Sequence, residues 1–292
     1  ATENTVIGYI AGSALTTGPG NTFLGSHCGD ETNDGANNTG VGYLSLSANC
    51  ADSNTAVGVA SLQACTGNNN VAVGTNALLK SAAADINIGI GSSAGGELTS
   101  GAQNICIGYL SGRHGVNLQT GSKNLLIGSY TDTSATDTDN ANAIGYNITG
   151  EEGYTTLGVD SSDIRAAHGN ITWATVSDER YKKDIVDSTA GLSFIKALKP
   201  RTFKYKNLGE LPETFRAYEA DSTDVFKNSN TNHGFIAQEV KTAIDADSGI
   251  KDGFKLWDER ADGSQEVAEA ALIPILVKAI QELEARVKEL EG

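Results

Sequence analysis

The sequence predicts a repetitive β-stalk of stacked or intertwined β-solenoid or β-roll coils, followed by a smaller α+β domain that ends in a long coiled-coil helix. Three observations predict it: a change of composition near residue 165, a short glycine repeat before that point, and an apolar pattern of helical period at the C-terminus. At about 100 to 200 residues per domain, a length of 292 residues also favours two domains.

The composition divides the chain into unlike parts. Residues 1–165 hold 26 of the 34 glycines, all 4 cysteines, 4 basic residues and 14 acidic ones, which leaves 17 basic and 22 acidic residues for the remainder. We therefore expect a β-stalk over 1–165, a linker over 166–176 and a second domain over 177–292. Methionine is absent and the chain begins with Ala1, so we expect it to be part of a longer protein.

The stalk repeat has the form Asn-x-x-aliphatic-Gly. We place its glycines at 8, 25, 42, 58, 74, 89, 108, 128, 145 and 158. The residue before each is Val, Ile or Leu, and seven copies carry the asparagine: Asn4, Asn21, Asn38, Asn54, Asn70, Asn104 and Asn124. In an eighth copy Asp85 takes its place. Such short repeats, bounded by Gly and Asn, predict short strands and tight turns.

The stalk is expected to need more than one chain. One aliphatic residue per repeat buries little, so we expect several chains to share the interior. Ten coils at a strand spacing of ~4.8 Å make a rod of roughly 50 Å. The pattern resembles the stacked coils of trimeric β-roll heads in surface adhesins and phage fibres. Cys50 and Cys65 fall at similar repeat positions, and we expect buried thiols in a ladder there.

Four separated motifs mark the second domain. The first is Ser177-Asp178-Glu179-Arg180-Tyr181-Lys182, and the second runs from Leu198 to Tyr205. The third is His233-Gly234-Phe235-Ile236-Ala237-Gln238-Glu239, and the last is a C-terminal helix containing Gln281-Glu282-Leu283. In this order and spacing they closely resemble the intramolecular chaperone auto-processing domain, of the endosialidase peptidase type, found at the C-terminus of phage tailspikes, tail fibres and neck appendages.

The resemblance implies a chemistry. In that family a trimeric domain helps a β-structured fibre to fold and then cuts itself off, as a serine endopeptidase that acts once in cis. Carried over, the cleaved bond is Val176–Ser177, Ser177 is the nucleophile, Lys182 is its general base and His233 supports cleavage. Asp178, Arg180, Gly234, Phe235, Gln238 and Glu239 are the remaining motif residues. A serine hydroxyl needs a neighbouring base near pH 7, and a desolvated lysine is able to lose its proton.

The C-terminal helix carries a seam. Its apolar residues alternate four and three apart, as in a coiled coil, at Leu276, Ile280, Leu283, Val287 and Leu290. This spacing predicts association with copies of the same helix and leaves their number open, and the family resemblance implies three. Pro274 is expected in the first helical turn.

Together with these observations, the family resemblance implies a homotrimeric virion tail fibre or appendage, made in the host cytoplasm, whose mature stalk is not itself an enzyme. Its expected partners are copies of itself, the rest of the virion tail and a host surface receptor or glycan. The net charge of −15 argues against nucleic acid or an anionic membrane as partner. We expect no cofactor and no metal site. The alternatives are a cellular trimeric surface adhesin with the same domain, and a polysaccharide-degrading tailspike.

Overall fold

A computed structural model describes residues 2–170, 172–250 and 254–292. The chain divides into two compact units, Ala1–Tyr181 and Lys182–Gly292. The first is a β-solenoid, and the second is a smaller mixed unit with a long C-terminal helix, so the predicted fold class is confirmed. Among the helices of the described ranges, none is both long and apolar enough to span a membrane.

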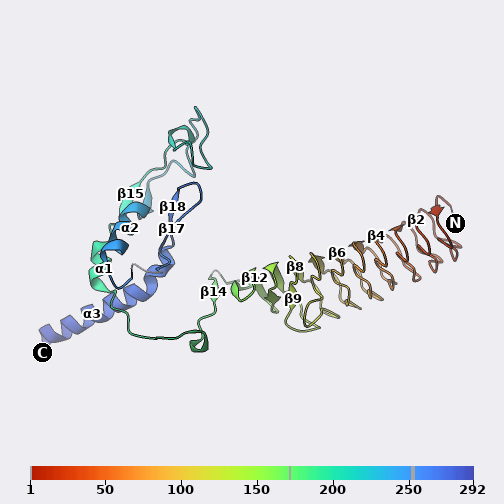
Figure 1. Cartoon of the computed structure of the whole chain (residues 1–292), viewed down its shortest axis with the longest axis horizontal. Coiled ribbons are helices and arrows are strands. Elements are labelled where there is room, and N and C mark those ends of the chain that lie inside the picture. Colours follow the sequence, from red (N-terminus) through yellow and green to blue (C-terminus); the bar gives the residue numbers. More distant parts are fainter. Residues whose placement is uncertain (1, 171, 251–253) are drawn as a thin grey trace. The chain divides into compact units, whose positions relative to one another are not determined.

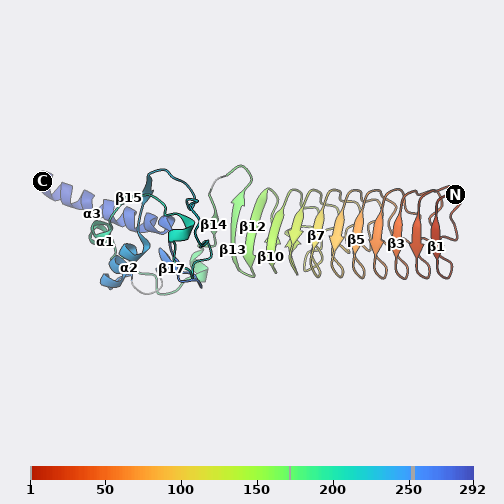
Figure 2. The same cartoon turned by 90° about the horizontal axis from the view of Figure 1, so that it is seen from above.

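The solenoid stacks one short strand from each coil into a single parallel sheet (Figures 1 and 2). Its parallel strands are β1 (Thr5–Ile7), β2 (Thr22–Leu24), β3 (Thr39–Val41), β4 (Thr55–Val57), β5 (Val71–Val73), β6 (Ile88–Ile90), β7 (Ile105–Ile107), β8 (Leu125–Ile127), β10 (Asn142–Tyr146) and β12 (Tyr154–Val159). Antiparallel strands β13 (Ser162–Ala167) and β14 (Ala174–Thr175) follow, and β9 (Asp132–Thr133) pairs with β11 (Thr149–Gly150).

The repeat asparagines form a buried ladder along the solenoid. The backbone N–H of Asn87 donates to Asn70 Oδ1 at 2.9 Å, and Asn87 Oδ1 accepts from the N–H of Asn104 at 2.9 Å. The Asn87 amide also donates to the carbonyl of Gly101 at 3.0 Å. The side chain of each ladder asparagine therefore satisfies backbone groups of the next coil, groups that would be costly to leave unpaired in the interior.

The repeat glycines let neighbouring coils approach closely. Gly74 has φ +132°, and a Cβ placed on it would lie 2.6 Å from the carbonyl oxygen of Gly91. Gly91 has φ +127° and stands in the same relation to Gly108, at 2.5 Å. Any larger residue would collide with backbone and adopt an unfavourable conformation. Glycine is thus required at this position of the coil.

The sixth repeat differs from our prediction. Val73 of β5 pairs with Ile90 of β6, so the repeat glycine is Gly91 and the ladder asparagine is Asn87. Gly89, which we had assigned, faces inward in the middle of β6, where a Cβ would meet Leu78. Asp85 instead accepts the N–H of Asn68 outside the buried ladder, at 2.6 Å. The correction makes the two flanking spacings equal.

The solenoid interior also differs from our prediction. It lies within one chain and is not shared. The aliphatic residue before each glycine points outward, and the interior is filled by the middle residue of the strand and by side chains from the turns, including Phe23, Cys28, Leu46, Leu62, Leu78 and Leu126. Small residues such as Ala56 and Ala72 suffice in mid-strand because leucines from the turns fill the remaining space. All four cysteines are free thiols and buried, as expected for the ladder positions of Cys50 and Cys65.

The second unit packs three helices around a small core. Its elements are α1 (Leu192–Ala197), β15 (Arg201–Phe203), a 3-10 turn η2 (Leu208–Glu210), β16 (Asn232–Gly234), α2 (Ala237–Ala246), β17 (Trp257–Glu259), β18 (Gln265–Val267), a 3-10 turn η3 (Glu269–Leu272) and α3 (Ile273–Glu291). The core contains Phe194, Val240, Ile244, Leu256 and Ile275. Pro274 lies in the first turn of α3, as predicted.

Candidate functional site

The predicted cleavage site lies on an exposed segment. Val176 is 53% exposed, and every residue from Thr172 to Thr189 is exposed in this single chain. The Val176–Ser177 bond falls between β14 and a 3-10 turn, η1 (Glu179–Tyr181). An exposed connection of this kind presents its backbone carbonyls to attack, as a cleavable peptide must.

The residues after Ser177 form a compact charged turn. The Arg180 guanidinium donates to both oxygens of Asp178, at 3.0 and 2.7 Å, and the Arg180 backbone N–H donates to Asp178 Oδ1 at 2.8 Å. These hydrogen bonds hold the pKa of Asp178 below its ordinary value of 3.8. Because the hydrogen bonds between Arg180 and Asp178 hold the residue next to Ser177, they fix the direction of the chain directly after Ser177.

Lys182 follows this turn directly and is exposed. The boundary between the two compact units falls between Tyr181 and Lys182. Ser177 therefore belongs to the first unit and Lys182 to the second. Pairing between the Ser177 hydroxyl and the Lys182 amine stays a prediction.

Strand pairing brings two of the predicted motifs together. His233 on β16 lies opposite Thr202 on β15, and Gly234 lies opposite Arg201. His233 is exposed at the edge of this pair. The motif that begins at Leu198 and the motif that begins at His233 are thus neighbouring strands of one hairpin-like sheet. Their joint occurrence in the sequence has a structural cause.

An ion pair joins the same motifs a second time. Arg201 Nε and Nη2 donate to the two carboxylate oxygens of Glu239, at 2.9 and 2.6 Å. The pair holds the pKa of Glu239 below its ordinary value of 4.5 and raises that of Arg201. Glu239 and Gln238 lie in the first turn of α2, where the helix dipole also favours a negative charge. Sequence reasoning missed the role of Arg201, although its motif was identified.

His233, Gly234 and Phe235 line two adjoining hollows of the second unit. One, of about 590 Å³, is bounded also by Arg201, Thr202 and Glu269. The other, of about 920 Å³, continues along the apolar side chains of the chain between β15 and β16. Glu269 borders both hollows, and no sequence motif pointed to it. The arrangement provides an open groove beside His233 with both charge signs at its rim.

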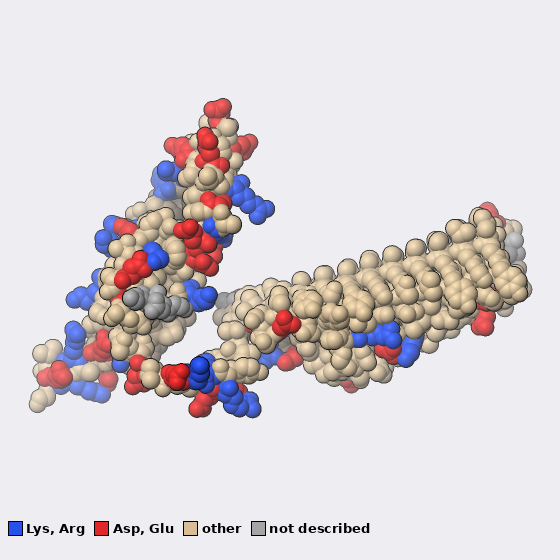
Figure 3. Space-filling view, in the orientation of Figure 1, with Lys and Arg blue, Asp and Glu red and all other residues tan. Residues whose placement is uncertain are grey.

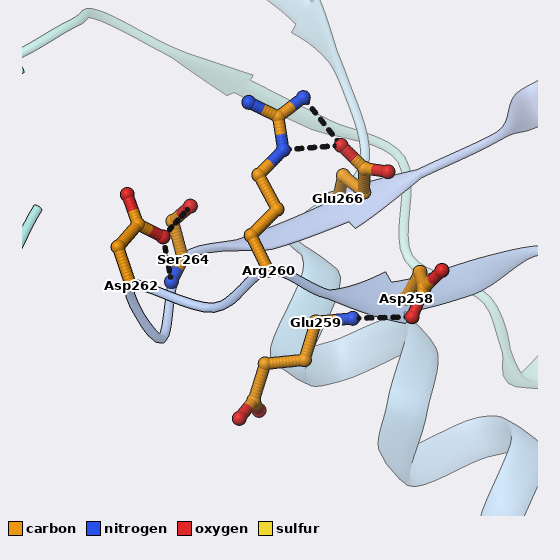
Figure 4. A network of polar contacts seen from close by, with 6 residues as sticks. All are labelled: Asp258, Glu259, Arg260, Asp262, Ser264 and Glu266. Carbon is orange, nitrogen blue, oxygen red and sulfur yellow. Dashed lines mark hydrogen bonds and ion pairs between the residues drawn. The ribbon is translucent and has the colours of Figure 1, made fainter. Parts of the chain in front are cut away.

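The β17–β18 hairpin forms one wall of the larger hollow. Figure 4 shows the polar contacts along this hairpin. Asp262 accepts the hydroxyl of Ser264 at 2.6 Å and its backbone N–H at 2.9 Å, and the N–H of Arg216 reaches Asp262 at 3.1 Å. These contacts lower the pKa of Asp262 to about 2. Arg260 pairs with Glu266 across the hairpin at 2.6 Å. Polar contacts therefore hold this wall and tie it to the loop that contains Arg216.

Helix α3 keeps its predicted seam outside the core of its own chain. Ile275 and Ala279 are buried against the unit, and Glu282 accepts the N–H of Leu192 at the start of α1, at 2.8 Å. The seam residues are 42 to 87% exposed: Leu276, Ile280, Leu283, Val287 and Leu290. The face that the sequence assigns to other copies is thus available to them, and association itself stays a prediction.

Part of the chain, beginning at Ser177, matches a known protein family. Residues 177–248 match the family described as chaperone of endosialidase. The match begins at Ser177 and extends just past α2, so it includes the β15–β16 pair and the Arg201–Glu239 ion pair. The searches of curated proteins and of solved structures gave no significant match. Residues 177–248 are therefore similar to the chaperone-of-endosialidase family, and the first three of the four predicted motifs lie inside the match.

Proposed function

We propose that residues 177–292 form an intramolecular chaperone, which aligns three solenoids during folding and then releases itself by cutting the Val176–Ser177 bond. The product is a homotrimeric stalk of a virion tail fibre or appendage, which contacts the host surface. One observation carries the proposal: the chaperone-of-endosialidase match begins at the residue that follows the proposed cleaved bond. The exposure of that bond supports it further.

The stalk itself explains the need for a chaperone. Its coils are nearly equivalent, with the same asparagine ladder and the same glycine column from one to the next. Chains that pair one coil out of register would lose few contacts, so the correct and incorrect assemblies differ little in free energy. A clamp at the C-terminal end that starts all three chains together removes this ambiguity.

The cleavage chemistry uses groups of this chain alone. The Lys182 amine accepts the proton of the Ser177 hydroxyl as Oγ attacks the carbonyl carbon of Val176. The C–N bond then breaks, the proton passes to the released nitrogen of Ser177, and the Val176 acyl group is held as an ester on Oγ. Water hydrolyses the ester, which leaves a carboxylate on Val176 and a free serine hydroxyl. His233 assists from the groove, as the family resemblance implies.

The clamp is the exposed seam of α3. Its spacing of four and three lets three parallel helices bury these apolar side chains against one another. Because Glu282 and Ile275 fasten the adjacent face of α3 to its own unit, association of the helices also brings the three chaperone domains together. Assembly is thereby coupled to the geometry of the domain that cuts.

Four variants of the chain test the proposed reaction. We expect the parent to divide into pieces of 176 and 116 residues, as counted to and from the Val176–Ser177 bond. Ser177→Ala and Lys182→Ala should remain whole, whereas Lys183→Ala, which removes the neighbouring exposed lysine, should still be cut. Ser177→Cys retains a nucleophile and should be cut in part. Denaturing gels with intact-mass analysis read all four.

Two results would contradict the assignment. Cleavage of Ser177→Ala at the same bond would show that the serine is not the nucleophile. Equal loss of cleavage in Lys182→Ala and Lys183→Ala would show that Lys182 has no special role as a base. Light scattering on the uncut variants checks that each still assembles.

A further inference from the structure

The outward face of the solenoid sheet carries an unbroken row of aliphatic side chains, here called the aliphatic stripe. Strand pairing aligns its members as Ile7, Leu24, Val41, Val57, Val73, Ile90, Ile107, Ile127, Ile144 and Leu157. Ile7 is 61% exposed, and Val73 in the middle of the row is 37% exposed. The stripe begins with the first strand and ends with the last parallel one.

The solenoid's own core does not need the stripe. In the parallel strands after β1 the residue between the two outward ones is buried, as at Phe23, Ala72 and Leu126. An outward position facing water is ordinarily polar in a sheet that has one face buried. Ten aliphatic residues on ten successive parallel strands therefore indicate a surface that is covered in the assembled protein.

The outward positions of the parallel strands carry no charged side chains. The outward residues two positions before the stripe are Thr5, Thr22, Thr39, Thr55, Val71, Ile88, Ile105, Leu125, Asn142 and Thr155. Neither they nor the stripe contain a Lys, Arg, Asp or Glu. The solenoid does carry charges elsewhere, such as Arg113 paired with Glu97 at 3.0 Å. Figure 3 shows how sparse they are on its visible face.

We infer that the aliphatic stripe is the surface on which the stalks of further copies of this chain pack side by side, parallel and in register. Three features select a copy over another partner. The stripe runs the whole length of the parallel stack, so a partner that covers it has the same length as the solenoid. Its residues recur every ~4.8 Å, a period that a second solenoid reproduces. The seam of α3 independently presents an apolar face to copies of itself.

The surface shape of the outward sheet face fits a ring-shaped assembly of copies of the chain. Each stripe residue is followed by a repeat glycine, such as Gly58 after Val57 and Gly74 after Val73, and these glycines are half-exposed. A ridge of aliphatic side chains therefore runs beside a shallow line of bare backbone. The aliphatic ridge of one copy fits the glycine line of the next copy. This contact joins two different surface patches, so three copies around a threefold axis form a closed ring. This inference rests on the homotrimer of the proposed function.

Site-directed cross-linking of the full chain tests the inference. Val57→Cys places a thiol on the stripe, and Val73→Cys repeats the test one coil further on. Ala64→Cys places a thiol at an exposed position later in the same coil as Val57. The four native cysteines are buried, so the parent chain measures the background. The probe is a short homobifunctional maleimide, and reducing denaturing gels read the products.

We expect both stripe variants to give a two-chain band, the largest product that one accessible thiol per chain allows, with at least tenfold more product than Ala64→Cys. Stripe variants that link no better than Ala64→Cys, in protein that light scattering shows to be trimeric or monomeric, would overturn the inference. Cleavage at Val176–Ser177 is read on the same gels. Cleavage without cross-linking would refute only the packing of the stripe. Cross-linking without cleavage would refute only the proposed self-release.

Discussion

Replacing Asn87 by alanine tests the coil register at the place where sequence and structure differ. The Asn87 side chain accepts the N–H of Asn104 and donates to the carbonyl of Gly101, and it is fully buried. Asn87→Ala leaves both backbone groups without these partners. Each unpaired buried group costs about 1–3 kcal/mol, so we expect a loss of about 2–6 kcal/mol in the free energy of unfolding.

Asp85→Ala is the matched control. Asp85 also accepts a backbone N–H, from Asn68, but it is only half-buried, so water is able to take its place. We expect a loss of about 0.5–1.5 kcal/mol. The assay is guanidinium unfolding followed by far-ultraviolet circular dichroism, or the unfolding half-life at fixed denaturant if the stalk does not refold. A cost for Asp85→Ala that equals or exceeds that of Asn87→Ala would refute the register and the reasoning from ladder hydrogen bonds.

Three further predictions concern other parts of the chain. Because Arg201 lowers the pKa of Glu239 below 4.5, the charged pair stabilises the second unit at pH 7, and this contribution is lost as the pH falls through the lowered pKa of Glu239. Arg201→Gln should thus lower the melting temperature at pH 7 by an amount that shrinks as the pH is lowered into the acid range, and a difference that stays constant with pH would contradict this. The buried Ser81 hydroxyl has no hydrogen-bond partner within the described residues, so Ser81→Ala should raise the free energy of unfolding by about 1 kcal/mol, measured by denaturant midpoint; a loss of that size would contradict this. Leu283→Asp with Leu290→Asp should give uncut, non-trimeric chain by light scattering and denaturing gel, and efficient cutting by monomers would uncouple the seam from cleavage.

The repeat motif predicted the solenoid because each of its residues has one structural task. The asparagine forms the ladder, the aliphatic residue faces outward and the glycine permits close stacking. The sixth copy was misplaced because Ile88-Gly89 and Ile90-Gly91 both satisfy the motif and only stacking decides between them. Equal spacing was the signal that favoured Gly91.

The source of the interior was harder to predict. The buried residues come partly from mid-strand positions that vary from Phe23 to Ala56, and partly from turn leucines such as Leu62. No single repeat position is consistently large and apolar there, so the pattern drew attention to the outward row. Sequence reasoning therefore found the regular position and mistook its direction.

The chaperone domain was predictable where its motifs are local. The charged turn at Asp178 and the seam of α3 both follow from near neighbours in the sequence. The Arg201–Glu239 pair joins residues 38 positions apart, and the position of Glu269 depends on how η3 packs beside β16. Such contacts are products of tertiary packing, which no local spacing encodes.

The reversal of the chain after β12 fixes where the stack of coils ends. A stack of equivalent coils has no intrinsic length, since each coil contacts only its neighbours. The parallel stack stops because β13 returns antiparallel to β12, and a Cβ on Gly158 would meet the carbonyl oxygen of Ser162 at 2.5 Å instead of another coil. Whole coils can therefore be gained or lost upstream, in steps of ~4.8 Å, while the terminating hairpin stays the same. The length of the solenoid is thus a separately adjustable property, set by the count of coils and independent of the domain that follows.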